Sequence, residues 1–257
     1  VDRITPRTTD KLRFEVDNTF PGFGLTCVQT EEYTQWVIEE KFATCFPDLT
    51  KVGVTITRDI EPYEESKIRI LNGAHTSLAY MGVLSGYNTF DQVMNDKLHR
   101  QHFRRLQSEE IIPSIEIDLP FDVHEYVDQV EKRISSKLNT DELERICMDG
   151  FTKFHTFIVP SLRKCLEQGK RPIHIYKSIA AWYIYSRKFA KGCSKIKYSE
   201  PNWVLLRPLL EDGNIDAFVT NERLWGDIPK QYITFTRDLK TILMSQTYEK
   251  EIDLIGE

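Results

Sequence analysis

Four polar side chains between residues 64 and 86 have the types needed for acid–base chemistry on a hydroxyl group. They are Glu64, Lys67, Asn72 and His75. An α-helix advances about 100° per residue, so these side chains would project at roughly 60°, 0°, 140° and 80° and would share one arc. A solvated helix face without any function would show the same arc. The spacing alone therefore does not distinguish a catalytic group from an ordinary protein surface.

Lys67 is the candidate general base of this group. Aliphatic residues beside the arc would bury it, and burial disfavours the charged form of a lysine. These residues are Ile68, Ile70, Leu71 and Leu78. A base that works near neutral pH needs a lysine pKa lowered from about 10.4 to roughly 7 to 8, so that the amine can take a proton from a hydroxyl. Asn72 and His75 would hold the same oxygen, and Glu64 would return the proton to solvent.

Two cations, Arg145 and Lys153, form a second candidate group. On a continuous helix they would lie about 80° apart and face one cleft. Their donors would suit a polyhydroxylated or carboxylated substrate, and like-charge repulsion would discourage protonation of Lys67. In the alternative, Arg145 pairs with a neighbouring carboxylate on the surface. Gly150, between them, either breaks the helix or permits close packing.

The residues from Lys67 to His75 form the pattern K-x-R-x-L-N-G-x-H, which resembles the signature of the mannitol dehydrogenase family. Members of this family are polyol-specific long-chain dehydrogenases and reductases that work without zinc. The resemblance implies that Lys67 is the catalytic base and that Asn72 and His75 polarise and position the reacting oxygen. The arrangement R-x(3)-D-G-x(2)-K also resembles this family, and it implies that Arg145 and Lys153 contact the sugar.

The N-terminal sequence VDRITP resembles the segment that closes the cofactor-binding half in the same family. The resemblance implies that Val1 and Asp2 lie near the nicotinamide and that Asp2 also neighbours the substrate. A dinucleotide site usually needs a strand, a Gly-rich turn and a helix. The only Gly-x-Gly of the sequence, at Gly22 and Gly24, follows a polar stretch and is typical of a turn.

The chain also begins without methionine. We therefore expect it to be the C-terminal portion of a longer enzyme and to be inactive alone, with an N-terminal dinucleotide-binding domain supplying most of the NAD or NADP site. The resemblance implies hydride transfer between a sugar alcohol and a ketose, with mannitol and fructose as the leading pair. The alternatives are a hexuronate reductase acting on fructuronate or tagaturonate, and a helical binding or regulatory module without catalysis.

Composition limits the other possibilities. The hydrophobic fraction of 40% and the charged fraction of 28% are those of an ordinary globular protein. A net charge of −5 with scattered basic residues argues against nucleic acid and membrane partners. Without a signal peptide or an apolar run of about 20 residues, the expected location is cytoplasmic. The odd number of cysteines, without CxxC, argues for reduced thiols and against zinc: Cys27, Cys45, Cys147, Cys165 and Cys193.

Hydrophobic periodicity predicts a mainly α fold. We expect a multi-helix substrate domain over residues 61–257, preceded over residues 1–60 by a small α/β remnant of a dinucleotide-binding domain. A strand is predicted over residues 52–60, whereas residues 31–42 are ambiguous between helix and strand. Further helices are predicted over residues 92–110, 121–135, 172–186 and 233–244.

Overall fold

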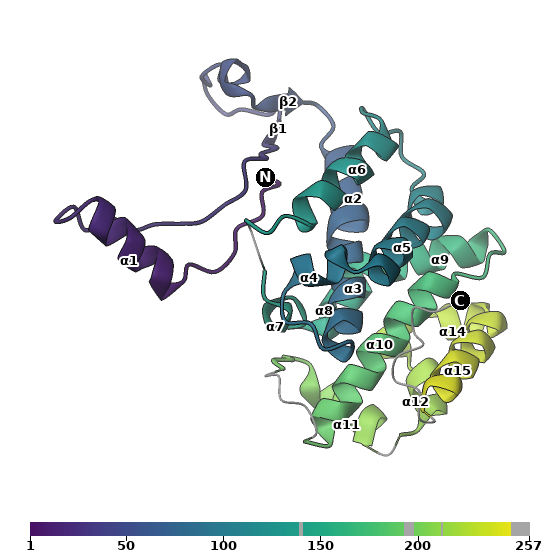
Figure 1. Cartoon of the computed structure of the whole chain (residues 1–257). Coiled ribbons are helices and arrows are strands. Elements are labelled where there is room, and N and C mark those ends of the chain that lie inside the picture. The colour runs from purple at the N-terminus through teal and green to yellow at the C-terminus, as the bar shows by residue number, and fades with distance from the viewer. Residues whose placement is uncertain (139–140, 193–197, 212, 248–257) are drawn as a thin grey trace.

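The computed structural model describes residues 1–138, 141–192, 198–211 and 213–247. Most of these residues form a body of packed helices, and parts of the N-terminal region project from it (Figure 1). The prediction of a mainly α fold with a small α/β part at the N-terminus is confirmed. The domain boundary at residue 60 stays a prediction.

The elements follow one another with short connections through most of the body. The N-terminal ones are α1 (Asp10–Thr19), β1 (Val37–Glu39), the 3₁₀-helix η1 (Leu49–Val52) and β2 (Thr55–Thr57). The next are α2 (Glu61–Ser66), the π-helix η2 (Lys67–Gly73), α3 (Ala74–Leu84), α4 (Phe90–Asn95), α5 (Lys97–Arg105), the π-helix η3 (Leu106–Ile111), the 3₁₀-helix η4 (Ile112–Ser114) and α6 (Val123–Ile134). The last are α7 (Leu143–Ile146), α8 (Gly150–Lys153), the π-helix η5 (Phe154–Ile158), α9 (Val159–Glu167), α10 (Ile173–Ala190), α11 (Trp203–Glu211), α12 (Ile215–Val219), α13 (Glu222–Trp225), α14 (Ile228–Gln231) and α15 (Ile233–Thr247).

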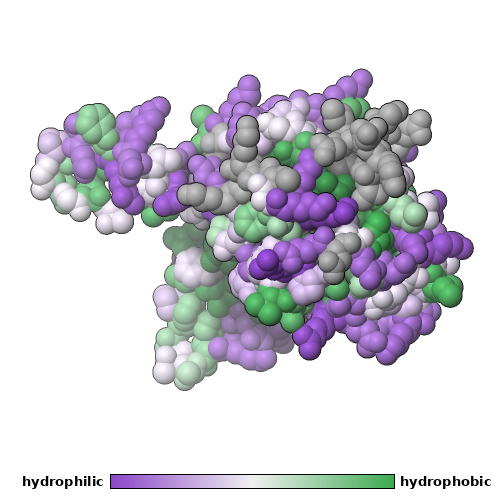
Figure 2. Space-filling model, turned by 90° about the horizontal axis from the view of Figure 1, so that it is seen from below, coloured by the Kyte–Doolittle hydropathy of each residue, from purple (hydrophilic) through white to green (hydrophobic). Residues whose placement is uncertain are grey.

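The N-terminal region contributes little to the hydrophobic core of the body. Strands β1 and β2 pair in parallel, with Val37 opposite Thr55, and every residue in them is only partly buried. Helix α1 buries none of its residues. Apolar and polar groups are mixed on the projecting parts (Figure 2). Exposed apolar side chains in this region include Phe14, Phe20, Phe23, Leu25, Val28, Trp36 and Val52.

The core of the body is centred on α3 and α10, which pack against each other (Figure 1). Aromatic rings fill the space around them. The ring of Phe154 stacks on that of Trp182 with centroids 4.5 Å apart, and Tyr80 meets Tyr185 edge-on at 5.3 Å. Because α3 is buried over most of its length and continues directly from η2, the core fixes the helix that carries the candidate base.

The helix predicted over residues 92–110 is interrupted. Thr89 and Gln92 form a capping box that starts α4, and the backbone of Asp96 is extended. The Asp96 carboxylate then accepts hydrogen bonds of 3.0 Å from the N–H groups of Leu98 and His99, which starts α5. The predicted helices over residues 121–135, 172–186 and 233–244 correspond to α6, α10 and α15.

Three π-helical segments lie beside one another inside the body, since η2 contacts both η3 and η5. The prediction of one regular α-helix over residues 64–86 is therefore wrong. Helix α2 gives way to η2 after Ser66, and regular α-helix resumes at Ala74. In a π-helix each hydrogen bond joins a residue to one five positions away, so an advance of about 100° per residue does not apply.

Two observations concern thiols and membranes. Cys27, Cys45, Cys147 and Cys165 are free thiols, and Cys193 lies outside the described residues. No helix in the part of the chain that the structure describes is long and apolar enough to cross a membrane.

Candidate active site

The π-helical segment η2 changes which of the predicted site residues share a face. In an α-helix the residue four positions on lies nearly above the first, and in a π-helix the residue five positions on does so. Lys67 and Asn72 are five positions apart and both lie in η2. They therefore share one side of the helix instead of projecting roughly 140° apart.

A cavity of 230 Å³ opens beside this face, between the N-terminus and the helix formed by α2 and η2. Val1, Asp2, Glu64, Lys67 and Asn72 line it. Lys67 is half-buried, and its Nζ donates a hydrogen bond of 2.8 Å to the carbonyl oxygen of Val1. Glu64 is exposed at the solvent side. The structure thus brings five predicted site residues to one cavity.

His75 lies just beyond η2, in the first turn of α3, and does not line that cavity. Its ring meets Phe90 edge-on, with centroids 4.1 Å apart. Burial lowers the pKa of His75 to about 4; the Asp141 carboxylate opposes this shift, and the Arg145 and Lys153 cations add to it. The imidazole is therefore neutral at physiological pH, and its single N–H can donate a hydrogen bond to an oxygen.

Arg145 and Lys153 do not lie on one continuous helix, so the angle of about 80° expected for that case does not apply, and the break at Gly150 that the sequence left open is present. Arg145 belongs to α7 and Lys153 to α8, and Asp149 between them is left-handed with φ of 54°. The Arg145 guanidinium donates two hydrogen bonds to the buried Asp141 carboxylate. Lys153 Nζ donates to the Ile146 carbonyl at 2.7 Å, and burial lowers the Lys153 pKa.

Gly150 both starts α8 and permits close packing. A Cβ atom at this position would stand 2.4 Å from Trp182 Nε1 and 2.5 Å from Tyr80 Oη. No side chain fits there, so the connection from α7 to α8 sits directly on the aromatic core. This contact sets the position of Lys153 at the end of α8.

The second group of predicted residues is separated from the first. Arg145 lines a different hollow, of 420 Å³, together with Arg7 and Arg13. Lys153 lines neither hollow. His75 connects the two groups, because it follows η2 in the chain and its pKa responds to both cations.

Asp2 carries a structural contact that sequence reasoning missed. The residue is only 3% exposed. Arg133 of α6 donates to both Asp2 oxygens, at 2.8 and 2.9 Å, and also binds Glu31 at 2.8 and 3.0 Å. Tyr126 adds a hydrogen bond of 3.2 Å to Asp2. Because Glu31 and Asp2 lie 102 and 131 residues from Arg133 in the chain, no local motif signals the cluster.

Comparison with known proteins agrees with this architecture. Residues 59–243 match the family model described as the mannitol dehydrogenase C-terminal domain. A mannitol 2-dehydrogenase of Pyrenophora tritici-repentis is 31% identical over 258 aligned residues, which cover 99% of this chain and 45% of that protein. A mannitol dehydrogenase of Saccharomyces cerevisiae is 37% identical over 190 residues, covering 72% of this chain and 37% of the relative.

The comparison with solved structures agrees with the sequence comparisons. The mannitol 2-dehydrogenase of Pseudomonas fluorescens, solved as a ternary complex with NAD and D-mannitol, superposes with a TM-score of 0.86 at 28% identity. The superposition covers 99% of this chain and 52% of that one. The chain belongs to the mannitol dehydrogenase family, as its signature indicated. It spans about half the length of the relatives it matches, and its match to the family model lies in the C-terminal domain.

Proposed function

We propose that this chain is the substrate-binding and proton-transferring part of an NAD(P)-dependent, zinc-independent oxidoreductase. The reaction is the interconversion of a sugar alcohol and a ketose, of the mannitol and fructose type. The observation that carries the proposal is the placement of Lys67 and Asn72 on one side of a π-helical turn, at a cavity of 230 Å³. An amine and an amide that face the same space can act on one oxygen.

The chain's own residues fit one end of a nicotinamide cofactor. Val1 and Asp2 border the cavity of Lys67, which is smaller than the roughly 300 to 1,000 Å³ of common ligand sites. We therefore assign only the nicotinamide end to this chain. An N-terminal dinucleotide-binding domain of the same protein would hold the remainder. The two-stranded parallel sheet, which is only partly buried, supports this assignment, because parallel strands are almost always covered on both faces.

In the proposed mechanism Lys67 removes the proton of the reacting hydroxyl, and in the reverse direction it returns that proton. Asn72 donates a hydrogen bond to the same oxygen as it becomes a carbonyl, and we assign a second one to His75, which lies three residues further along the helix, just outside the cavity. A bound nicotinamide supplies the hydride chemistry at the adjacent carbon. Glu64, exposed at the rim of the cavity, exchanges the proton of Lys67 with solvent.

The hydrogen bonds that Arg145 and Lys153 already make favour a neutral polyol over a hexuronate as the substrate. Arg145 is already bound by the Asp141 carboxylate, and Lys153 by a backbone carbonyl. A substrate carboxylate would have to displace Asp141, whereas sugar hydroxyls can add to the donors that both side chains keep. The hexuronate reductase is therefore the second candidate.

The test is made on the full-length protein, by following NADH and NADPH absorbance with mannitol, fructose, fructuronate and tagaturonate. We expect turnover with the mannitol and fructose pair, and a loss of at least about 100-fold in Lys67→Ala without a change in unfolding temperature. Turnover with the hexuronates alone would select the second candidate. Absence of turnover with every pair, or full activity in Lys67→Ala, would favour the non-catalytic binding module.

A further inference from the structure

A side chain from another helix reaches the backbone of the π-helical turn that carries Lys67. Gln107 of η3 donates a hydrogen bond of 2.8 Å from its Nε2 to the carbonyl oxygen of Ile70. Gln107 is 1% exposed, and Ile70 is fully buried. The bond therefore joins two buried groups that lie 37 residues apart in the chain.

The position of the Ile70 carbonyl matters because it lies between Lys67 and Asn72. A π-helical turn replaces the regular hydrogen bonds of the α-helix, and groups inserted into that ladder locally reshape a helix. The turn at Ile70 is what brings Lys67 and Asn72 to one side. The Gln107 amide on η3 thus holds the backbone at Ile70, which sets the angle between the side chains of Lys67 and Asn72.

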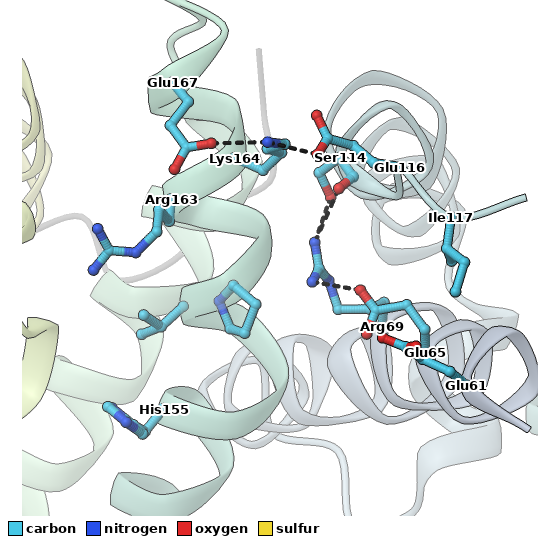
Figure 3. A pocket seen from close by; sticks show the side chains of 12 residues that line it. Glu61, Glu65, Arg69, Ser114, Glu116, Ile117, His155, Arg163, Lys164 and Glu167 are labelled. Atoms are coloured by element: carbon cyan, nitrogen blue, oxygen red, sulfur yellow. Dashed lines mark hydrogen bonds and ion pairs between the residues drawn. The ribbon is translucent and has the colours of Figure 1, made fainter.

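A second set of hydrogen bonds holds η2 through the side chain of Arg69. Arg69 donates to Ser161 of α9 at 2.6 Å, to Ser114 at 2.9 Å and to Glu65 at 2.8 Å. Figure 3 shows the guanidinium between the side chains of Glu65 and Ser114, at the edge of a pocket of 530 Å³. A Cβ atom on Gly73 would stand 3.3 Å from the Phe157 carbonyl oxygen of η5, so η2 also packs closely against the third π-helical segment.

The carbonyl oxygen of the Gln107 amide does not explain why an amide stands at this position. In the described part of the chain no donor reaches the buried Oε1 of Gln107. A buried acceptor without a partner destabilises a fold, and an apolar side chain of similar shape would avoid that loss. The presence of an amide at this site is explained by its donor, which meets the Ile70 carbonyl.

We propose that Gln107 is a positioning residue for the reaction: its hydrogen bond to the Ile70 carbonyl maintains the π-helical turn that aligns Lys67 with Asn72. The proposal rests on the proposed function of those two residues. Gln107 itself does not line their cavity. It acts through the backbone, so it affects the alignment of the base more than the binding of the sugar or the cofactor.

The test is Gln107→Met in the full-length protein, because methionine has a similar length and cannot donate. Gln168→Met is the matched control, since the Gln168 amide also donates to a carbonyl of another element, that of Pro113 at 2.9 Å. We expect kcat of Gln107→Met to fall about ten- to a hundredfold with a much smaller change in KM. The unfolding temperature should change little, because the variant removes the unpartnered Oε1 together with the bond to the Ile70 carbonyl. Gln168→Met should keep the wild-type kcat.

A second readout does not depend on activity. Amide hydrogen exchange of residues 67–75 should become at least about tenfold faster in Gln107→Met and stay unchanged in Gln168→Met. Unchanged kcat or unchanged exchange in this segment would overturn the positioning role, as would a loss of stability with normal kcat. If the wild-type protein turns over none of the substrates, the proposed function fails, and the exchange measurement still decides whether Gln107 holds the turn.

Discussion

At the scale of single residues, the protonation state of His75 decides what it can do at the site. Burial lowers its pKa to about 4, so the ring is neutral over the whole physiological range. A neutral imidazole is both a donor and an acceptor. In the proposed mechanism it can therefore hold a hydroxyl before the reaction and a carbonyl after it, without a charge that would repel the neighbouring cations.

The pKa of His75 leads to a titration experiment. We expect the imidazole resonances of His75, followed by NMR, to shift with a midpoint near pH 4, well below the ordinary value of about 6.5. Since the protonated form appears only at that low pH, His75 should cause no step in the pH–rate profile between pH 5 and 8. A midpoint near 6.5 would contradict the neutral donor and would move the acidic limb of the profile.

At the scale of elements, the π-helical turn is the feature that sequence periodicity could not reveal. The pattern around Lys67 and Asn72 correctly indicated a helix, but it assumed regular α geometry. The turn is held by Gln107 and by Ser161, which come from η3 and α9. Contacts made 37 and 92 residues away leave no local signal in the sequence.

Helix ends could be predicted where the sequence contains a recognisable capping residue. The helix predicted over residues 121–135 agrees with α6, whose N-cap Asp122 accepts bonds from two backbone N–H groups. The break at Asp96 was missed because apolar residues continue on both sides of it. The sequence left open whether Arg145 and Lys153 share one helix, since Gly150 is compatible with either a break or close packing.

The start of α10 depends on a buried carboxylate. Glu110 of η3 accepts hydrogen bonds of 2.7 Å from the N–H groups of His174 and Ile175. Burial raises the pKa of Glu110 to about 7, and the two backbone bonds oppose that shift. Because the folded pKa is raised, this group stabilises the fold most below its unfolded pKa, and the contribution is lost as the pH rises through about 7.

The test at this scale is Glu110→Gln, which removes the titration. Between pH 5 and 8 the free energy of unfolding of the wild type should fall relative to the variant by on the order of 1 to 3 kcal/mol. Chemical denaturation at several pH values measures the difference. Glu125→Gln, on the exposed face of α6, is the control for loss of a surface charge. A pH-independent difference for Glu110→Gln would contradict the raised pKa.

At the scale of the whole molecule, one buried cation joins the N-terminal region to the helical body. Arg133 binds the carboxylates of Asp2 and Glu31 and lies over the ring of Tyr33, 4.0 Å from its centroid. This cluster places Val1 and Asp2 at the cavity of the candidate base. The sequence indicated through its family resemblance that Val1 and Asp2 belong to the site, but it gave no sign of what holds them there.

Replacing Arg133 by Met should therefore affect more than its own helix. Two buried carboxylates would lose their partner, and we expect a loss of about 3 to 5 kcal/mol in the free energy of unfolding. Arg207→Met, which removes an exposed pair with Glu211, should cost about 0.5 kcal/mol or less. Limited proteolysis should cut residues 1–31 faster in the Arg133 variant. Equal stability of the two variants would show that the cluster does not anchor this region.

The most direct measurement of the central claim is chemical rescue of Lys67→Ala in the full-length protein, with polyol oxidation followed as NADH formation. A small primary amine added to the variant should restore part of the lost rate, and the restored rate should increase with the basicity of the amine. The wild-type rate should not respond to the amine. A variant that oxidises the polyol as fast as the wild type without added amine would show that Lys67 is not the base.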